Sequence, residues 1–176
     1  NPANAMMEMG RRQERCDHYE EALGNEPNGH MVHLNYGVTM YRIGRLDVAL
    51  KHLDEAIRTD ASNGMAHFQK AGVLEKLGRL PEAEKSLREA LRVKQDFADA
   101  RSNLGGVLMQ QNRQKEAIAE YEQAVSLKPD STALLYNLSG ALANIGQKDK
   151  AIEVIERALG LNPNDAMGHY QLGVIL

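Results

Sequence analysis

The sequence predicts an all-α fold, a right-handed superhelical solenoid built from antiparallel helix pairs. The first observation is a period of 34 residues, which indicates an array of repeated units. One alanine series that follows this period is Ala22, Ala56, Ala90, Ala124 and Ala158, and a second is Ala49, Ala83, Ala117 and Ala151. The second observation is that apolar residues within each unit recur three and four positions apart, which is helical spacing. The third is a glycine or asparagine at each predicted turn, where these residues adopt positive φ at little cost.

Each complete unit is predicted to contain two helices joined by one such turn. Four complete units are expected, at 30–63, 64–97, 98–131 and 132–165, between a partial unit at 1–29 and the first helix of another at 166–176. The helix breaks are expected near Gly44, Gly78, Asn112 and Gly146, and Gly10 belongs to the same series. In the unit 98–131, the second helix should stop before Pro129, because proline cannot continue a helix. Since the chain begins and ends inside predicted first helices, we expect an excerpt of a longer array.

Small residues recur where the two helices of a unit should cross. The series in the first helix is Gly37, Ala71, Gly105, Ser139 and Gly173. Large residues of the second helix should fill the layer beside it, and they are Leu53, Leu87, Tyr121 and Ile155. Small side chains let paired helices approach to the short end of the ~8–10 Å range of interaxial distances. We therefore interpret Gly105 and Gly106 as a helix-packing pair.

The unit 98–131 resembles the tetratricopeptide repeat family. Leu104-Gly105, Ala117, Tyr121, Ala124 and Pro129 match the leucine-glycine, alanine, aromatic, alanine and proline positions of that family. The resemblance covers nearly the whole chain and implies a module that binds other proteins, with its first helices lining a concave groove. The family's tryptophan position differs here, and it holds His33, His67, Arg101, Leu135 and His169. The histidines among them are expected to pack between helices.

Composition and motifs exclude several function classes. The 176 residues carry a formal net charge of -3, which argues against a nucleic-acid partner. Apolar runs are too short to span a membrane, and a single cysteine, Cys16, excludes an intramolecular disulfide. No phosphate loop, HExxH pair or nucleophile elbow occurs, so neither an enzyme nor a bound cofactor is predicted.

His30 and His33 lack nearby cysteine or carboxylate partners in sequence, so no metal site is predicted. No secretory signal is visible, so a cytoplasmic location is expected. The mixed charges of the second helices, such as Glu84 and Arg88, should lie on a solvated convex face.

A column of primary amides is the strongest candidate for a binding site. Residues three and four apart on a helix share a face. On the expected groove face, the column is Asn35, Gln69, Asn103, Asn137 and Gln171. The larger apolar groups expected beside it are Leu34, Phe68, Tyr136 and Tyr170, together with Tyr41. An amide carries both a donor and an acceptor, so it can pair with one peptide unit of any sequence.

These columns predict a module that binds an extended peptide segment of another protein. The amide ladder resembles that of the tetratricopeptide arm of O-linked GlcNAc transferases, although two positions here are glutamine. One alternative is therefore a substrate-selecting arm of a glycosyltransferase whose catalytic part lies outside this chain. Another is a scaffold or self-associating segment of a larger protein. A third is that the amides only bond to one another or to helix backbones. Chaperone-binding members of the family carry a lysine in the first helix, and the equivalent positions here include Leu34, Phe68 and Tyr136. An acidic chaperone tail is therefore not expected as the ligand.

Overall fold

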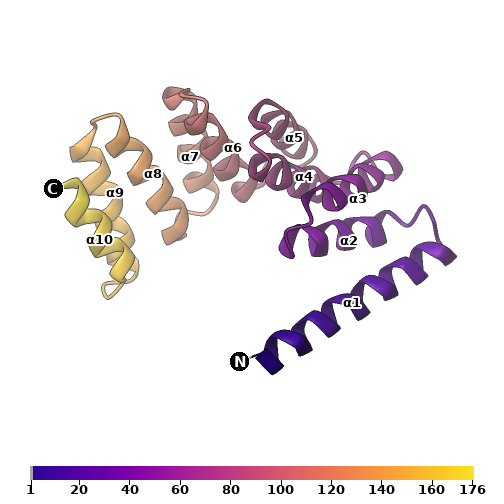
Figure 1. Ribbon diagram of the computed structural model, residues 1–176. Helices are drawn as coiled ribbons and strands as arrows, with labels where there is room; N and C mark the ends of the chain where they lie inside the picture. The colour runs from indigo at the N-terminus through magenta and orange to yellow at the C-terminus, as the bar shows by residue number, and fades with distance from the viewer. Residues whose placement is uncertain (1) are drawn as a thin grey trace. The chain divides into compact units, whose positions relative to one another are not determined.

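The computed structural model describes residues 2–176, and the side chains from residue 10 onward except residues 12 and 13. Within this range it contains ten α-helices and no strand (Figure 1). The helices are α1 Pro2–Asn25, α2 His30–Arg42, α3 Leu46–Thr59, α4 Gly64–Lys76, α5 Leu80–Val93, α6 Ala98–Gln110, α7 Gln114–Leu127, α8 Thr132–Asn144, α9 Lys148–Leu161 and α10 Ala166–Ile175. Helices that follow each other in sequence pack together from α1 to α4 in one part of the chain and from α5 to α10 in the other, which confirms the predicted all-α solenoid of helix pairs.

The four predicted turns between paired helices are confirmed. The residues with positive φ in the described chain are Gly44, Gly78, Asn112 and Gly146. At Asn112, φ is 59°, and the following Arg113 amide donates to the Leu108 carbonyl oxygen at 2.9 Å. This bond closes the left-handed turn that ends a helix, and the other three turns contain its equivalent. Glycine adopts this conformation without a steric penalty, and asparagine tolerates it better than most residues.

The chain divides into two compact units, Asn1–Arg79 and Leu80–Leu176, and the boundary falls at the turn of the predicted repeat 64–97. In the first unit, α2 and α3 form the closest pair, and the core includes Leu34, Met40 and Leu53. A Cβ added at Gly37 would lie 2.8 Å from Leu53 Cγ, so glycine is what allows the approach. The free thiol of Cys16 is buried in the same core.

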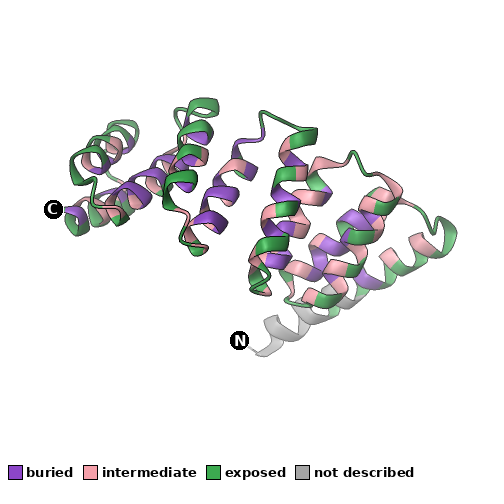
Figure 2. Cartoon of the chain, turned by 90° about the horizontal axis from the view of Figure 1, so that it is seen from above, coloured by how far each residue is buried: buried purple, intermediate pink, exposed green. Residues whose placement is uncertain are grey.

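In the second unit, α6 pairs with α7, and α8 pairs with α9. A Cβ added at Gly105 would lie 2.8 Å from Tyr121 Cε1, and the hydroxyl of Ser139 donates to the Ala151 carbonyl oxygen at 2.8 Å. Figure 2 shows buried residues on the inner sides of the helices and exposed residues on their outer sides. Gly37, Gly105 and Ser139 therefore take the predicted packing role, whereas a Cβ added at Gly173 would meet no atom within 4 Å, so the prediction is wrong at that position.

The predicted partial repeat at 1–29 folds differently from the complete repeats. α1 is one continuous helix through Gly10, so no turn occurs there. One glycine inside a helix costs about 1 kcal/mol, which the 24-residue helix α1 tolerates.

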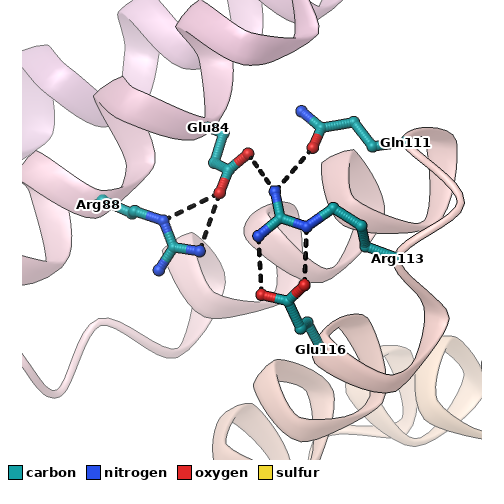
Figure 3. A network of polar contacts seen from close by, with 5 residues as sticks. All are labelled: Glu84, Arg88, Gln111, Arg113 and Glu116. Carbon is teal, nitrogen blue, oxygen red and sulfur yellow. Dashed lines mark hydrogen bonds and ion pairs between the residues drawn. The ribbon is translucent and has the colours of Figure 1, made fainter.

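An ionic network fixes α5 to the turn before α7 within the second unit (Figure 3). Arg113 donates to Glu84 at 2.7 Å and, with two nitrogens, to Glu116, while Arg88 also donates to Glu84. Burial alone would raise the pKa of Glu84, but the bonds from Arg88 and Arg113 hold that pKa below its usual value. Glu84 is therefore a half-buried structural group, and the prediction of a solvated residue is wrong at this position.

Candidate functional site

A cavity of about 320 Å³ opens on the first helices of the second unit, α6, α8 and α10. Its lining consists of Gly106, Met109, Tyr121, Tyr136, Asn137, Gly140, Ala141, Asn144 and Gln171. Three predicted site residues, Tyr136, Asn137 and Gln171, are thus brought together. None of the lining side chains carries a charge. The volume is at the lower end of the ~300–1,000 Å³ typical of ligand pockets.

Two glycines keep this cavity open. A Cβ added at Gly140 would meet no atom within 4 Å, and one added at Gly106 would meet only the Tyr121 hydroxyl, at 3.6 Å. Neither glycine is therefore required by the packing of helix against helix. The interpretation of Gly105 and Gly106 as a packing pair holds for Gly105 alone, since Gly106 faces the cavity.

Two buried polar atoms in the lining lack a hydrogen bond. Among the described residues, the buried side-chain atoms without a partner are Tyr136 Oη and Gln171 Oε1, and both residues line this one cavity. A buried polar atom left without a partner costs about 1–3 kcal/mol, so such atoms are rare in folded proteins. Both atoms are enclosed beside the cavity, so a ligand would complete their bonding after the Tyr136 or Gln171 side chain turns toward the cavity.

The environment of Tyr136 keeps its phenol protonated. The hydroxyl lies beside the carboxylate of Asp165 but outside hydrogen-bonding geometry. Burial first, and the nearby carboxylate second, raise the pKa of Tyr136 to about 12. The pKa of Asp165 is lowered by the Tyr136 hydroxyl and by the Met167 amide, which donates to this carboxylate at 2.9 Å at the start of α10.

The orientation of Asn137 is set by a neighbouring repeat. Its Nδ2 donates to the hydroxyl oxygen of Ser102 on α6 at 3.0 Å, which leaves Oδ1 as an acceptor without an internal partner. In the described chain, no amide of the column bonds to another amide. The nearest internal contact of Gln69 Nε2 is with Met65 Sδ at 3.6 Å. The alternative in which the amides satisfy one another is therefore not what the structure contains.

The remaining predicted residues lie outside this cavity. Asn103 is half-buried on α6, one turn before Gly106. In the first unit, Asn35 is exposed, and Gln69 and Phe68 are half-buried. On α10, Tyr170 is 69% exposed, so it is available to solvent but does not line the cavity.

Leu34 and Tyr41 also belong to the first unit. Leu34 is only 5% exposed and belongs to the core, so it offers little surface to a ligand, unlike the expectation of an apolar contact in the groove. Leu34 shares a repeat position with Tyr136 at the border between groove and core, and its short side chain is buried in the core. Tyr41 packs over Gly72, and Lys76 Nζ lies 4.8 Å from its ring centre. Burial first, and Glu75 second, raise the pKa of Tyr41.

Six lining residues were not predicted as site residues, namely Gly106, Met109, Tyr121, Gly140, Ala141 and Asn144. Met109 and Asn144 lie at helical spacing from the glycines that face the groove, three positions after Gly106 and four after Gly140. Extending the groove face by one turn along each first helix would have found both.

Other kinds of site find no support in the described residues. No group of three histidine, cysteine, aspartate or glutamate side chains lies close enough to hold a metal ion. No helix in the described part of the chain has the length and apolar character that crossing a membrane requires. Of the histidines expected to pack between helices, His33 does so, whereas His169 is exposed.

Comparison with known proteins identifies relatives of the fold. Two family models described as tetratricopeptide repeat match the chain, one at residues 7–66 and 68–132 and the other at 108–170. No curated protein matches it. A crystal structure of MamA is 22% identical and has a TM-score of 0.82, with 95% of this chain and 98% of that chain covered.

Two further solved structures cover most of both chains. YrrB, described as a TPR protein with an unusual peptide-binding site, is 24% identical with a TM-score of 0.75, and the match covers 89% of this chain and 81% of that chain. MamA from Desulfovibrio magneticus RS-1 is 25% identical with a TM-score of 0.75, and the match covers 83% and 82%. At these identities, the likeness shows a shared fold.

Proposed function

Because the chain belongs to the tetratricopeptide repeat family, we propose that it is a protein-interaction module whose cavity in the second unit binds an extended peptide segment of another protein. The observation that carries the proposal is one uncharged cavity that is lined by three of the predicted site residues and in which Gln171 Oε1 lacks a partner. A bound peptide would supply hydrogen bonds at this place. YrrB, which is described with a peptide-binding site, is a precedent for the fold in this role and says nothing about the ligand of this chain.

The amides act as acceptors in this proposal. Asn137 offers Oδ1, because its Nδ2 is used by Ser102, and Gln171 offers the unpartnered Oε1. The groups that bind them are N–H donors of the peptide backbone, which every residue except proline carries. Adjacent first helices lie one helix spacing apart, ~10 Å, and an extended strand rises ~3.3 Å per residue. The two amides therefore meet peptide N–H groups about three residues apart.

The apolar part of the lining selects side chains. Tyr121, Tyr136 and Met109 surround the space over the two glycines, so an apolar side chain of the peptide fits there. Because the lining is uncharged, a charged side chain would lose its hydration without gaining a partner. The expected ligand segment is uncharged where it enters the cavity.

The test uses a displayed library of random twelve-residue peptides as the probe. Peptides selected on the wild-type protein are measured against Gly140→Leu, which fills the cavity, and against Gly160→Leu as the matched control. Both glycines lie in helices, and an added Cβ would meet no atom within 4 Å at either, but Gly160 lies on α9 away from the cavity. Affinity should fall about tenfold or more for Gly140→Leu, which corresponds to about 1.4 kcal/mol. Equal affinities for the two variants, or no selected peptide, would contradict the proposal.

A second candidate function is self-association through α10. Its apolar residues Tyr170 and Val174 are 69% and 67% exposed and lie one turn apart on the helix. Val174→Asp should then abolish any dimer detected by sedimentation at rising protein concentration. A protein that remains monomeric at all concentrations would remove this candidate and leave the peptide-binding function untouched.

A further inference from the structure

Four aromatic side chains form a continuous stack in the first unit. Tyr19 of α1 lies against Tyr36 of α2, with ring centres 5.2 Å apart, and Tyr36 lies against His52 of α3 at 4.2 Å. His52 in turn faces His33 of α2 at 5.2 Å. The stack ties the first three helices together and places two histidines in direct contact.

The protons of the two histidines follow from their partners. His33 Nε2 lies 3.0 Å from the carbonyl oxygen of Pro27, which can only accept, so Nε2 carries a proton. The neutral ring of His33 then has a bare Nδ1, which lies 3.0 Å from Nδ1 of His52. His52 Nδ1 therefore donates to His33, and His52 Nε2 is left without a proton.

His52 also borders a cavity of about 490 Å³ between α1 and α3. Its lining consists of Glu20, Leu23, Gly24, Tyr36, Arg45, Val48, Lys51 and His52. Arg45 and Lys51 are exposed, and neither forms an ion pair within the described residues. Glu20 accepts a hydrogen bond from the Tyr36 hydroxyl at 3.0 Å. The lining thus has two cations, one carboxylate already bonded, and the aliphatic walls Leu23 and Val48.

We propose that this cavity binds a carboxylate carried on a short aliphatic body, and that His52 takes up a proton when the carboxylate binds. Arg45 and Lys51 supply the positive charge, while Leu23 and Val48 contact the aliphatic part. The proton comes from solvent and is added to Nε2 of His52. It does not disturb the bond to His33, because Nδ1 of His52 already carries the donated hydrogen.

The surroundings of His52 give the direction of the proton uptake. The groups that face it are His33 and Tyr36 on α2, Glu20 on α1, and Lys51 and Glu55 on α3. Burial, His33 and Lys51 lower the pKa of His52, so the ring is neutral near pH 7 while the cavity is empty. A bound anion favours the charged imidazolium and raises this pKa. By linkage, the carboxylate binds more tightly as the pH falls from 8 to 6.

Two neighbouring groups do not compete for this proton. Burial and then the bond to Glu20 raise the pKa of Tyr36 to about 12, so its phenol stays protonated across this range. Glu55 stays ionised, because the bond from Arg58 lowers its pKa. Tyr36 and Glu55 therefore do not exchange protons with solvent between pH 8 and 6.

The experiment titrates the protein with pentanoate and with pentanamide, its neutral counterpart, by calorimetry at pH 7 in two buffers of different ionisation enthalpy. The expected result is binding of pentanoate with net proton uptake, affinity roughly three- to tenfold higher at pH 6 than at pH 8, and no binding of pentanamide. A glutamate-containing acetylated peptide, used as a third probe, distinguishes a side-chain carboxylate from a free acid as the source. Equal binding of pentanamide, absence of binding by both carboxylates, or affinity independent of pH would overturn the proposal.

A pair of variants locates the site. Lys51→Gln should weaken pentanoate binding roughly fivefold by removing one cation from the lining. Lys85→Gln on α5 removes an exposed lysine that lies away from the cavity, and it should leave binding unchanged. Both lysines are exposed, so both variants should fold. Equal effects of the two would show that binding follows overall charge and would refute the proposed site.

Discussion

The adjacent glycines Gly105 and Gly106 allow a direct test of the packing argument. Replacing glycine by alanine inside a helix stabilises it by about 0.8–1 kcal/mol. At Gly106 the added Cβ would lie 3.6 Å from the Tyr121 hydroxyl, an ordinary contact, so Gly106→Ala should raise the free energy of unfolding by about 1 kcal/mol. The same change one residue earlier has a different environment.

At Gly105 the added Cβ would lie 2.8, 2.9 and 3.0 Å from Cε1, Cζ and Cδ1 of Tyr121. Tyr121 is only 7% exposed, so its ring has little room to move. Overpacking of this kind costs about 1–3 kcal/mol, which exceeds or cancels the gain in helix propensity. We expect Gly105→Ala to lie about 1–3 kcal/mol below Gly106→Ala in stability.

The assay is urea unfolding followed by circular dichroism, with the slope m compared among variants. Tyr121→Leu provides the control, because leucine occupies the equivalent positions 53 and 87 of other repeats. In the Tyr121→Leu background, Gly105→Ala should no longer destabilise, which a double-mutant cycle measures. If Gly105→Ala and Gly106→Ala have the same stability in the wild-type background, the assignment of separate roles to these glycines is wrong.

Three further predictions concern the second unit. Glu84→Gln should lower the free energy of unfolding at pH 7 by about 1–2 kcal/mol, because it breaks bonds to two arginines. Since the pKa of Glu84 in the folded protein lies below its unfolded value of 4.5, this contribution is complete above that value and is lost as the pH falls through the folded pKa. Acid titration of stability should therefore be less steep for Glu84→Gln than for the wild type, and parallel curves would count against the network. At the turn, Asn112→Ala should cost about 1 kcal/mol and Asn112→Gly should not, because φ is 59° there, and thermal unfolding distinguishes the two. The affinity for selected peptides should depend weakly on salt, and a steep salt dependence would place the binding surface elsewhere. Asn137→Ala should lower the affinity for unrelated peptides by similar factors, each on the order of 1 kcal/mol.

The repeat pattern was sufficient to predict the fold because each turn depends on a single residue with positive φ. Gly44 and Asn112 illustrate this, since both end a helix at the predicted position. Gly10 belongs to the same series of residues, yet α1 continues through it, so a glycine at this repeat position does not by itself end a helix.

The site was predictable only in part, because helical spacing indicates which face a residue occupies and not how deeply it is buried. Tyr136, Asn137 and Gln171 were predicted to lie near one another, and they line one cavity. Leu34 occupies the same column as Tyr136 yet lies in the core. The side-chain hydrogen bonds of the site also cannot be predicted from a repeat pattern. The bond from Asn137 to Ser102, for example, depends on one serine that the other repeats lack at that position.

The glycines that line the cavity have a consequence for how the protein could change over time. Alanine would suit Gly106 and Gly140 better by about 1 kcal/mol each, and nothing in the packing opposes it. Together these substitutions amount to about 2 kcal/mol, a large share of the 5–15 kcal/mol that holds a typical domain folded. Each needs only one nucleotide change, so selection or engineering for thermal stability alone would reach them readily. The resulting protein would be more robust, with less room in its cavity.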